Sequence, residues 1–313
     1  MLNGREPRIT TMYDEKTAGR SESGSEISDE VLTQVRASLG LPDSVPNDLD
    51  GLRTVYGAWC GAMTFDNISK RISLHARDER LAGSDAEDYF QNWLENRSGG
   101  TCWASSNALY TLIASYGFDA RRVAGAMFDL PALNHGSVKV RIDGLDWLAD
   151  SSMLTVEPLP LNGELLIKAD GPVRVEVEPQ KEGYLIWVDF PPHHEFIPCR
   201  LRDDPVDLAL YQERYEASRE VSPFNERLYL RKVKPDGLTV ILGNTLFRRV
   251  GEELDVRELS ADDLCTTIHE IGGVSESLIS KWVDAGGLDA SMDSSSSGPQ
   301  FPDPGPRPSR RSA

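Results

Sequence analysis

The spacing of apolar residues divides the chain into a helical stretch followed by stretches of strand. Toward the end of the first stretch, apolar residues between Trp103 and Tyr116 recur at every third or fourth position, which predicts a helix opened by Cys102. Gly117 stands where a glycine commonly ends a helix. Another helix is predicted from Ala86 to Leu94, with Ser84 as its N-cap.

After Gly117, apolar and polar residues alternate in short runs, which is the pattern of half-buried strands. The first two strands cover 138–142 and 145–149, and Asp143-Gly144 between them is typical of a hairpin turn. Further strands are predicted at 174–177, 184–190, 227–233, 238–242, 245–249 and 254–258, and helices from Ser260 and from Glu276 to Trp282.

These patterns predict an α+β fold in three parts. We expect a helical subdomain over 28–118, a β-barrel subdomain over 119–215 and an α/β lid subdomain over 216–285. The polar segments 1–27 and 286–313 have no periodicity and are predicted to be a disordered leader and a disordered Ser/Pro/Gly tail.

Composition narrows the range of functions. Hydrophobic residues make up 39% and charged residues 27% of the chain, and the formal net charge is −17. Such acidity argues against nucleic-acid binding, which usually needs a basic face. We expect no secretory leader and no membrane span. The four cysteines form no CxxC pair, so we expect free thiols, no metal site and a cytoplasmic location.

Cys102 is the candidate nucleophile. It lies in the first turn of a predicted helix, where unpaired N–H groups and the helix dipole stabilise a thiolate. Gly99 and Gly100 precede it, and we expect them to bring the backbone close to a substrate and to supply amides to an oxyanion. The alternative for Cys102 is a buried structural thiol, which is the usual state of a free cysteine.

A histidine and an aspartate follow Cys102 in the order of a catalytic triad. His135 stands just before a predicted strand, from which it can take the thiol proton. Asp150 ends the return strand of the hairpin, which should bring its carboxylate beside His135. Asp146 is the rival carboxylate, but it lies nearer the turn, where we expect solvent.

Several segments, in the same order, resemble the arylamine N-acetyltransferase family. Met63-Thr64-Phe65-Asp66-Asn67-Ile68 resembles its Pro-Phe-Glu-Asn-Leu segment, and Gly99-Gly100-Thr101-Cys102-Trp103 resembles its Gly-Gly-aromatic-Cys motif. The other similar segments are Tyr116-Gly117-Phe118, Arg122-Val123-Ala124-Gly125, Ser222-Pro223-Phe224-Asn225, Lys234-Pro235-Asp236-Gly237 and Leu259-Ser260. Together they cover about residues 30–277.

The resemblance implies a papain/transglutaminase-like Cys-His-Asp fold. It also implies ping-pong transfer of an acyl group, acetyl by default, from a CoA thioester through Cys102 to an arylamine or arylhydrazine nitrogen. His135 would act as base and acid, and Asp150 would orient it. The residues expected to contact substrate are Phe65, Gly99, Gly100, Trp103, Ser222 and Phe224. The resemblance implies no bound cofactor and no metal.

The chain departs from the family pattern at four places, one of which is Ala104, where the family favours Glu or Gln. Ser98 stands where the family has an arginine before the two glycines, and Asp66 stands where it has a glutamate. The segment Ser151-Ser152-Met153 replaces a glycine-containing turn close to the expected path of CoA. The acyl donor is therefore open, and an acyl carrier protein is the alternative to CoA.

Three other functions remain compatible with the sequence. One is an amide synthase that releases a carrier-bound polyketide or peptide chain. Another is a transglutaminase-like thiol hydrolase or protease, with which Gly117-Phe118-Asp119-Ala120-Arg121 is also compatible. The last is a binding or scaffold protein whose triad is inert.

Overall fold

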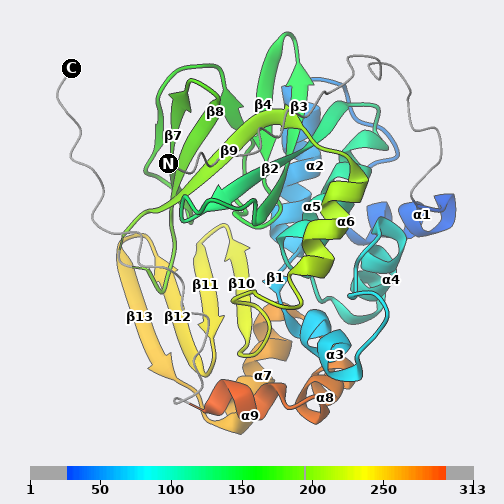
Figure 1. Cartoon of the computed structure of the whole chain (residues 1–313), viewed down its shortest axis with the longest axis vertical. Coiled ribbons are helices and arrows are strands. Elements are labelled where there is room, and N and C mark those ends of the chain that lie inside the picture. Colours follow the sequence, from blue (N-terminus) through cyan, green and yellow to red (C-terminus); the bar gives the residue numbers. More distant parts are fainter. Residues whose placement is uncertain (1–26, 194, 294–313) are drawn as a thin grey trace, which may run out of the picture.

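A computed structural model describes residues 27–193 and 195–293 of the chain. Its first part is helical and is drawn in blue and cyan in Figure 1. Acidic or hydroxyl side chains cap most of these helices, because such oxygens accept the otherwise unpaired N–H groups of a first turn. The helices are α1 (Asp29–Ser38), α2 (Leu49–Ala62), α3 (Ile68–Ala76), α4 (Ala86–Asn96) and α5 (Cys102–Ala114).

The helix predicted from Ala86 is confirmed as α4, but the prediction of its N-cap is wrong. The cap is Asp85, whose carboxylate accepts the N–H of Asp88 at 2.9 Å. The Ser84 hydroxyl instead donates to the carbonyl of Leu81. Local sequence does not separate two adjacent capping residues, since either can accept from the first turn.

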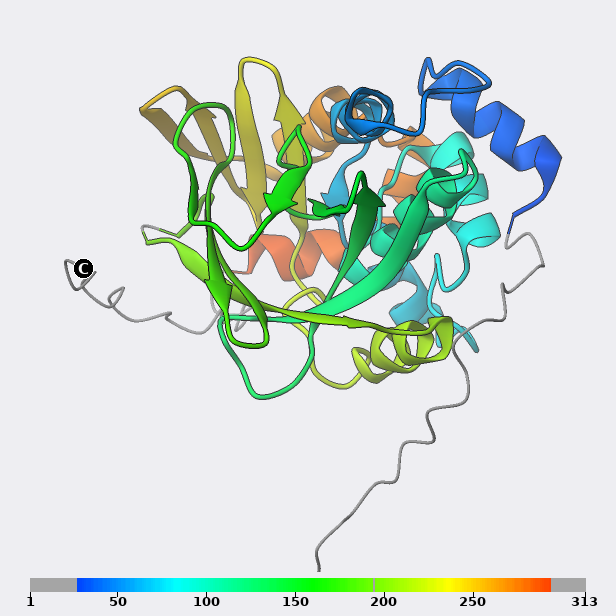
Figure 2. The same ribbon diagram turned by 90° about the horizontal axis from the view of Figure 1, so that it is seen from above.

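The middle part is one antiparallel sheet in the order β5-β4-β3-β2-β9-β8-β7-β6, whose strands curve when seen from above in Figure 2. The two edge strands, β5 and β6, approach each other. Lys168 of β6 donates to the carbonyl of Thr155, a residue shortly before β5, at 3.5 Å. The sheet is therefore nearly closed, as the predicted β-barrel requires. The strands are β2 (Asp119–Met127), β3 (His135–Ile142), β4 (Leu145–Ala149), β5 (Leu159–Leu161), β6 (Leu166–Lys168), β7 (Arg174–Gln180), β8 (Gly183–Asp189) and β9 (Ile197–Pro205).

The hairpin between β3 and β4 is confirmed with the predicted register. Val138 pairs with Ala149 and Ile142 with Leu145. Asp143 and Gly144 both have positive φ, +49° and +81°. Two such residues form the tight turn whose twist matches that of the strands.

The last part is a second antiparallel sheet with helices against one side (Figure 1). Its edge strand β1 (Phe65–Asp66) comes from the helical part, and Phe65 pairs with Arg231. The first and last parts thus share a sheet. The other elements are α6 (Leu208–Ala217), which leads into this part, β10 (Tyr229–Lys234), β11 (Gly237–Leu242), β12 (Thr245–Val250), β13 (Glu253–Glu258), α7 (Ala261–Gly272), α8 (Glu276–Asp284) and α9 (Gly287–Met292).

The predicted disordered tail begins too early. Residues within it form α9, and Ser291 of that helix accepts the backbone N–H of Leu228 at 2.9 Å. Of the predicted leader, Ile27 is buried in the main core. The rest of both segments, 1–26 and 294–313, lies outside the described residues.

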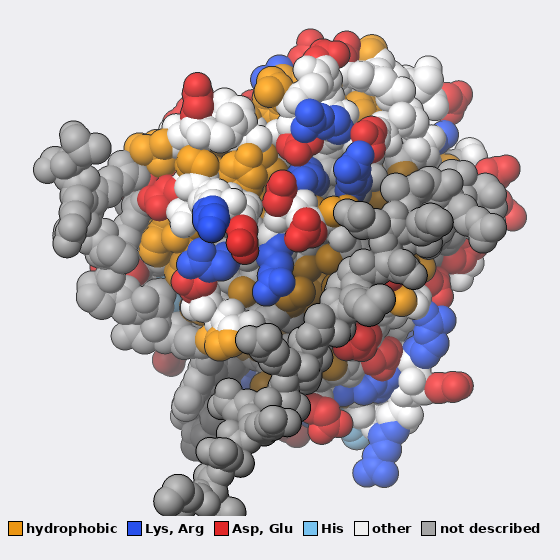
Figure 3. Space-filling view, turned by 45° about the horizontal axis from the view of Figure 1, so that its top comes forward, with side chains coloured by type: hydrophobic (Ala, Val, Ile, Leu, Met, Phe, Trp, Pro, Cys, Tyr) orange, Lys and Arg blue, Asp and Glu red, His pale blue; other side chains and the backbone are white. Residues whose placement is uncertain are grey.

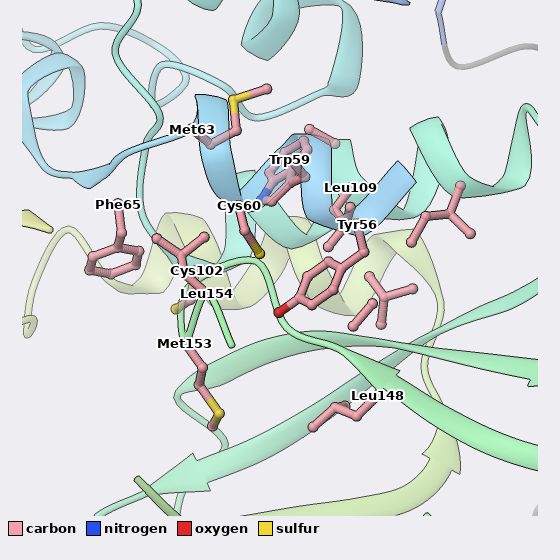
Figure 4. Packing of buried hydrophobic residues seen from close by; sticks show 14 of the residues in the cluster. Tyr56, Trp59, Cys60, Met63, Phe65, Cys102, Leu109, Leu148, Met153 and Leu154 are labelled. Atoms are coloured by element: carbon pink, nitrogen blue, oxygen red, sulfur yellow. The ribbon is translucent and has the colours of Figure 1, made fainter. Parts of the chain in front are cut away.

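Helix α5 forms the centre of the molecule. Nearly every residue from Cys102 to Ile113 is buried, and the helix contacts α2, α4, α6, β2 and β3. Figure 4 shows Cys102 at one end of this core, near Phe65, Met153 and Leu154. Within the described ranges, no helix combines the length and the apolarity needed to cross a bilayer.

The turn that precedes α5 requires glycine. A Cβ on Gly99 would lie 1.8 Å from the carbonyl oxygen of Thr64, and Gly100 has a φ of +70°. The backbone at Gly99 therefore touches the segment just before β1, a contact that no larger residue permits.

We expect Gly99→Ala to lower the free energy of unfolding by at least about 2 kcal/mol, because the clash is with backbone that cannot rotate away. Gly61→Ala is the matched control: a Cβ there meets nothing within 4 Å, on the exposed side of α2. That change should stabilise the protein by up to about 1 kcal/mol. Urea denaturation of both variants measures the difference, and equal effects would show that the Gly99 contact is not tight.

Candidate active site

Cys102 is the first residue of α5, as predicted. Its N-cap, Thr101, makes no side-chain bond to the first turn. The N–H groups at this helix start are therefore not covered by a capping side chain, which favours negative charge at the sulfur. The thiol is 7% exposed, and its Sγ lies 3.6 Å from the carbonyl oxygen of Asn134.

His135 and Asp150 form a buried pair beside this thiol. Nε2 of His135 lies 2.7 Å from Oδ2 of Asp150, and both side chains are almost fully buried. The side chain of Cys102 lies close enough to His135 to raise the pKa of its imidazole. The β3–β4 hairpin brings the histidine and the aspartate together, since His135 opens β3 and Asp150 follows β4. The structure thus places the three predicted triad residues in one chain of contacts.

The turn after Asp150 holds the other carboxylate oxygen. Oδ1 accepts the N–H of Ser152 at 2.9 Å, the Ser152 hydroxyl at 2.9 Å and the N–H of Met153 at 2.7 Å. The serine-rich turn that departs from the family pattern therefore orients the aspartate. An aspartate that accepts bonds from the residues just after it is a common turn device.

Hydroxyl groups on two helices, α5 and α2, hold the turn that contains Asp150. The Ser151 hydroxyl lies within 2.8 Å of the hydroxyls of Ser105 and Ser106, both on α5. Tyr56 on α2 donates to the carbonyl of Asp150 at 2.8 Å. The helix that carries the thiol and the turn that carries the carboxylate are thus joined directly.

Opposing effects set the charges of the pair. Burial lowers the pKa of His135, but the charge of Asp150 outweighs it and raises that pKa well above the ordinary 6.5. Burial raises the pKa of Asp150, but the charge and hydrogen bond of His135 lower it below the ordinary 3.8. The pair is therefore an imidazolium and a carboxylate at neutral pH.

A cavity of about 830 Å³ opens at this pair. Its lining includes Cys102 and His135 together with four of the predicted substrate residues, Phe65, Trp103, Ser222 and Phe224. Phe65 and Phe224 meet edge to face, with ring centroids 5.1 Å apart. The wall is mostly apolar, which suits an aromatic or aliphatic substrate body.

The prediction for Gly99 is wrong. Its N–H donates to Oδ2 of Asp66 at 2.7 Å, so this amide is not available to an oxyanion. Neither Gly99 nor Gly100 lines the cavity. Ser98, at the position where the family has arginine, donates to Oδ1 of Asp66 at 2.7 Å. The pair Ser98–Asp66 thus anchors the turn before Cys102, and neither residue lines the cavity.

The sequence analysis missed three cations in the cavity wall, Lys70, Arg214 and Arg231. Lys70 on α3 is buried and donates to the Ser218 hydroxyl at 2.8 Å; burial lowers its pKa to about 8, and the nearby Cys102 partly offsets this. The one available signal was for Arg231, which lies on the same face of β10 as Tyr229 and Val233 because side chains alternate along a strand. Among the described residues, no cluster of three His, Cys, Asp or Glu side chains could hold a metal.

A buried thiol–imidazolium–carboxylate chain between a helix start and a hairpin, in an α+β frame, defines a class of proteins with a cysteine-centred site. Residues 48–276 match the family model described as N-acetyltransferase, so the chain belongs to the N-acetyltransferase family. The resemblance found in the sequence is thereby confirmed.

Individual relatives are distant. An uncharacterized acetyltransferase of Bacillus subtilis (strain 168), YvcN, is 26% identical over 167 residues, which cover 50% of this chain and 65% of that protein. The arylamine N-acetyltransferase of Mycobacterium marinum in complex with CoA has a TM-score of 0.70 and 19% identity, covering 84% of this chain and 98% of that one. The enzyme from Salmonella typhimurium has a TM-score of 0.68 and 16% identity, covering 83% and 99%. These structures confirm the predicted fold.

We expect Asp150→Asn to lower the free energy of unfolding by about 3–5 kcal/mol near pH 5–6, because it leaves a buried imidazolium without its partner. The raised pKa of His135 means that its share of stability is complete below 6.5 and is lost as pH rises through the raised value. The lowered pKa of Asp150 means that its share is complete above 3.8 and is lost as pH falls. Urea denaturation across this pH range measures the difference.

Asp146→Asn is the matched control on the same strand. Asp146 pairs with the half-exposed Arg141 at 3.0 Å and with the buried Lys139 at 3.5 Å. Because Lys139 keeps its shorter ion pair with Asp203, at 2.7 Å, the loss of Asp146 should cost no more than about 1 kcal/mol. An equal loss of stability in both variants, or no dependence on pH in Asp150→Asn, would contradict the buried ion pair.

Proposed function

We propose that the protein is an N-acyltransferase that moves an acyl group, acetyl by default, from a CoA thioester through Cys102 to an arylamine or arylhydrazine nitrogen. The observation that carries this proposal is the position of Cys102 beside the buried His135–Asp150 pair at an apolar cavity, in a chain of the N-acetyltransferase family. CoA is proposed as donor because the Mycobacterium marinum structure of the same fold holds it.

In the first half of the reaction, the sulfur of Cys102 attacks the thioester carbonyl while its proton rests on His135. The developing oxyanion lies near the start of α5, where the N–H groups are not covered by a capping side chain. The C–S bond to CoA then breaks, and the imidazolium of His135 returns its proton to the leaving thiolate. Asp150 keeps the ring oriented throughout and stabilises its charge whenever the ring is protonated.

In the second half, the amine attacks the acyl-Cys102 carbonyl. Neutral His135 accepts a proton from the amine nitrogen, the C–S bond to Cys102 breaks, and the thiolate–imidazolium pair is restored. Phe65, Trp103 and Phe224 line the cavity and would hold the aromatic ring of the acceptor against apolar wall. Ser222 at the rim would offer a hydroxyl to either substrate.

We expect incubation with acetyl-CoA to add one acetyl group to the intact protein, at Cys102, because this thiol lines the cavity beside His135. Cys199 is also near His135, but it is fully buried outside the cavity lining, and burial raises its pKa to about 12. Cys102→Ala should give no adduct. Cys265→Ala is the matched control, since Cys265 is a partly exposed free thiol and its removal should leave acetylation unchanged. His135→Gln should slow acetylation about 10²- to 10⁴-fold. Mass spectrometry of the intact protein measures each.

Adding an arylamine should then discharge the adduct and form the amide. An adduct only from a carrier-bound acyl chain would select the amide-synthase reaction. Hydrolysis of amide substrates without transfer would select a thiol hydrolase. Acetylation that survives in Cys102→Ala would contradict the proposed mechanism.

A further inference from the structure

Arg231 is a buried cation in the wall of the cavity. It lies on β10 directly opposite Phe65 of β1, and its side chain is only 3% exposed. The guanidinium carbon sits 4.1 Å from the ring centroid of Phe190 and 5.3 Å from that of Phe65. Both rings also line the cavity. The guanidinium is thus held near two aromatic rings at the edge of the substrate space.

No described side chain neutralises this cation. Nε and Nη1 of Arg231 are buried and have no hydrogen-bond partner within the described ranges. Arg249 on the neighbouring part of the sheet shows the contrast, because it pairs with Asp189 at 3.1 Å and donates to two carbonyls. Burying a charge without a partner is unfavourable, and ring contacts offset only part of the cost. A partner from outside the protein would complete the site.

We propose that Arg231 binds a carboxylate carried by a substrate. The guanidinium presents a planar fork of N–H donors, and a carboxylate matches that fork with two parallel hydrogen bonds. The neighbouring walls are the rings of Phe65, Phe190 and Phe224, so the body that bears the carboxylate is apolar. Acidic and basic side chains are interspersed over the face shown in Figure 3, so selection for this charge rests on the cavity and not on a broad surface patch.

The carboxylate has two possible sources, because the proposed reaction brings two substrates to Cys102. It can belong to the acceptor, as in an aminobenzoate, or to the far end of the acyl group, as in a dicarboxylic acyl thioester. This inference rests on the proposed transfer reaction, and the first test below is chosen so that it needs no transfer.

The acceptor is tested by binding to the Cys102→Ala protein, which cannot be acylated at that position. Calorimetric titration compares 4-aminobenzoate with 4-aminobenzamide, which has the same shape and no charge. We expect 4-aminobenzoate to bind about 10- to 100-fold more tightly, the usual size of a charge-assisted hydrogen bond. Adding Arg231→Gln should remove that difference, and Arg231→Lys should keep only part of it.

The donor is tested with the wild-type cysteine. Intact mass measures the rate of acylation by succinyl-CoA and by butyryl-CoA, two chains of equal length that differ in a terminal carboxylate. A preference for succinyl-CoA that disappears in Arg231→Gln would place the carboxylate on the acyl group. If the protein prefers neither 4-aminobenzoate over 4-aminobenzamide nor succinyl-CoA over butyryl-CoA, the proposal is overturned. So does an equal effect of Arg231→Gln on charged and neutral ligands, which would indicate a role in packing or in binding CoA itself.

Arg248→Gln is the matched control, because Arg248 lies on the same sheet but is exposed and outside the cavity. It should alter neither preference. The melting temperature of Arg231→Gln should not fall, since no described acid pairs with Arg231. If 4-aminobenzoate binding depends on Arg231 while no thioester acylates Cys102, the transfer reaction fails and the carboxylate site stands.

Discussion

The buried ion pair between His135 and Asp150 is the interaction on which the rest of the site depends. Two charges removed from water are stable only when their hydrogen bonds are satisfied. Asp150 receives four such bonds, from His135, the Ser152 N–H and hydroxyl, and the Met153 N–H. The hairpin supplies the histidine and the aspartate, and the α5 hydroxyls and Tyr56 hold the turn behind them. The charge beside Cys102 is therefore maintained by three separate segments.

The turn before Cys102 also fixes the geometry of the site, by holding the start of α5. Asp66 on β1 accepts from Ser98 and from the Gly99 N–H, which anchors the start of α5 to the sheet that carries Arg231. The position of the sulfur thus depends on the first and last parts of the chain together. The cavity therefore has one wall from α5 and β3, with Cys102 and His135, and another from β1 and β10, with Phe65 and Arg231.

Sequence patterns predicted correctly those elements whose structure depends on neighbouring residues in the chain. The β3–β4 hairpin was predictable because Asp143-Gly144 tolerates positive φ at both positions, and α5 because its apolar spacing ends at Gly117. The pairing of β1 with β10 was not, since two residues show no periodicity and their partners lie far along the chain. Lys70 and Arg231 were missed because charged residues are normally exposed, and only tertiary packing buries them. Gly99 was misassigned because its partner, Asp66, is also remote in sequence.

The central claim is that Asp150 keeps His135 protonated beside Cys102 at neutral pH. Nitrogen-detected NMR titration of the histidine rings tests it most directly, with His135→Gln used to assign the signal. The raised pKa of His135 predicts that its ring stays imidazolium well above pH 6.5 in the wild type, and that Asp150→Asn returns the titration toward the ordinary 6.5. A wild-type ring that loses its proton near pH 6.5, or one that titrates identically in Asp150→Asn, would contradict the account.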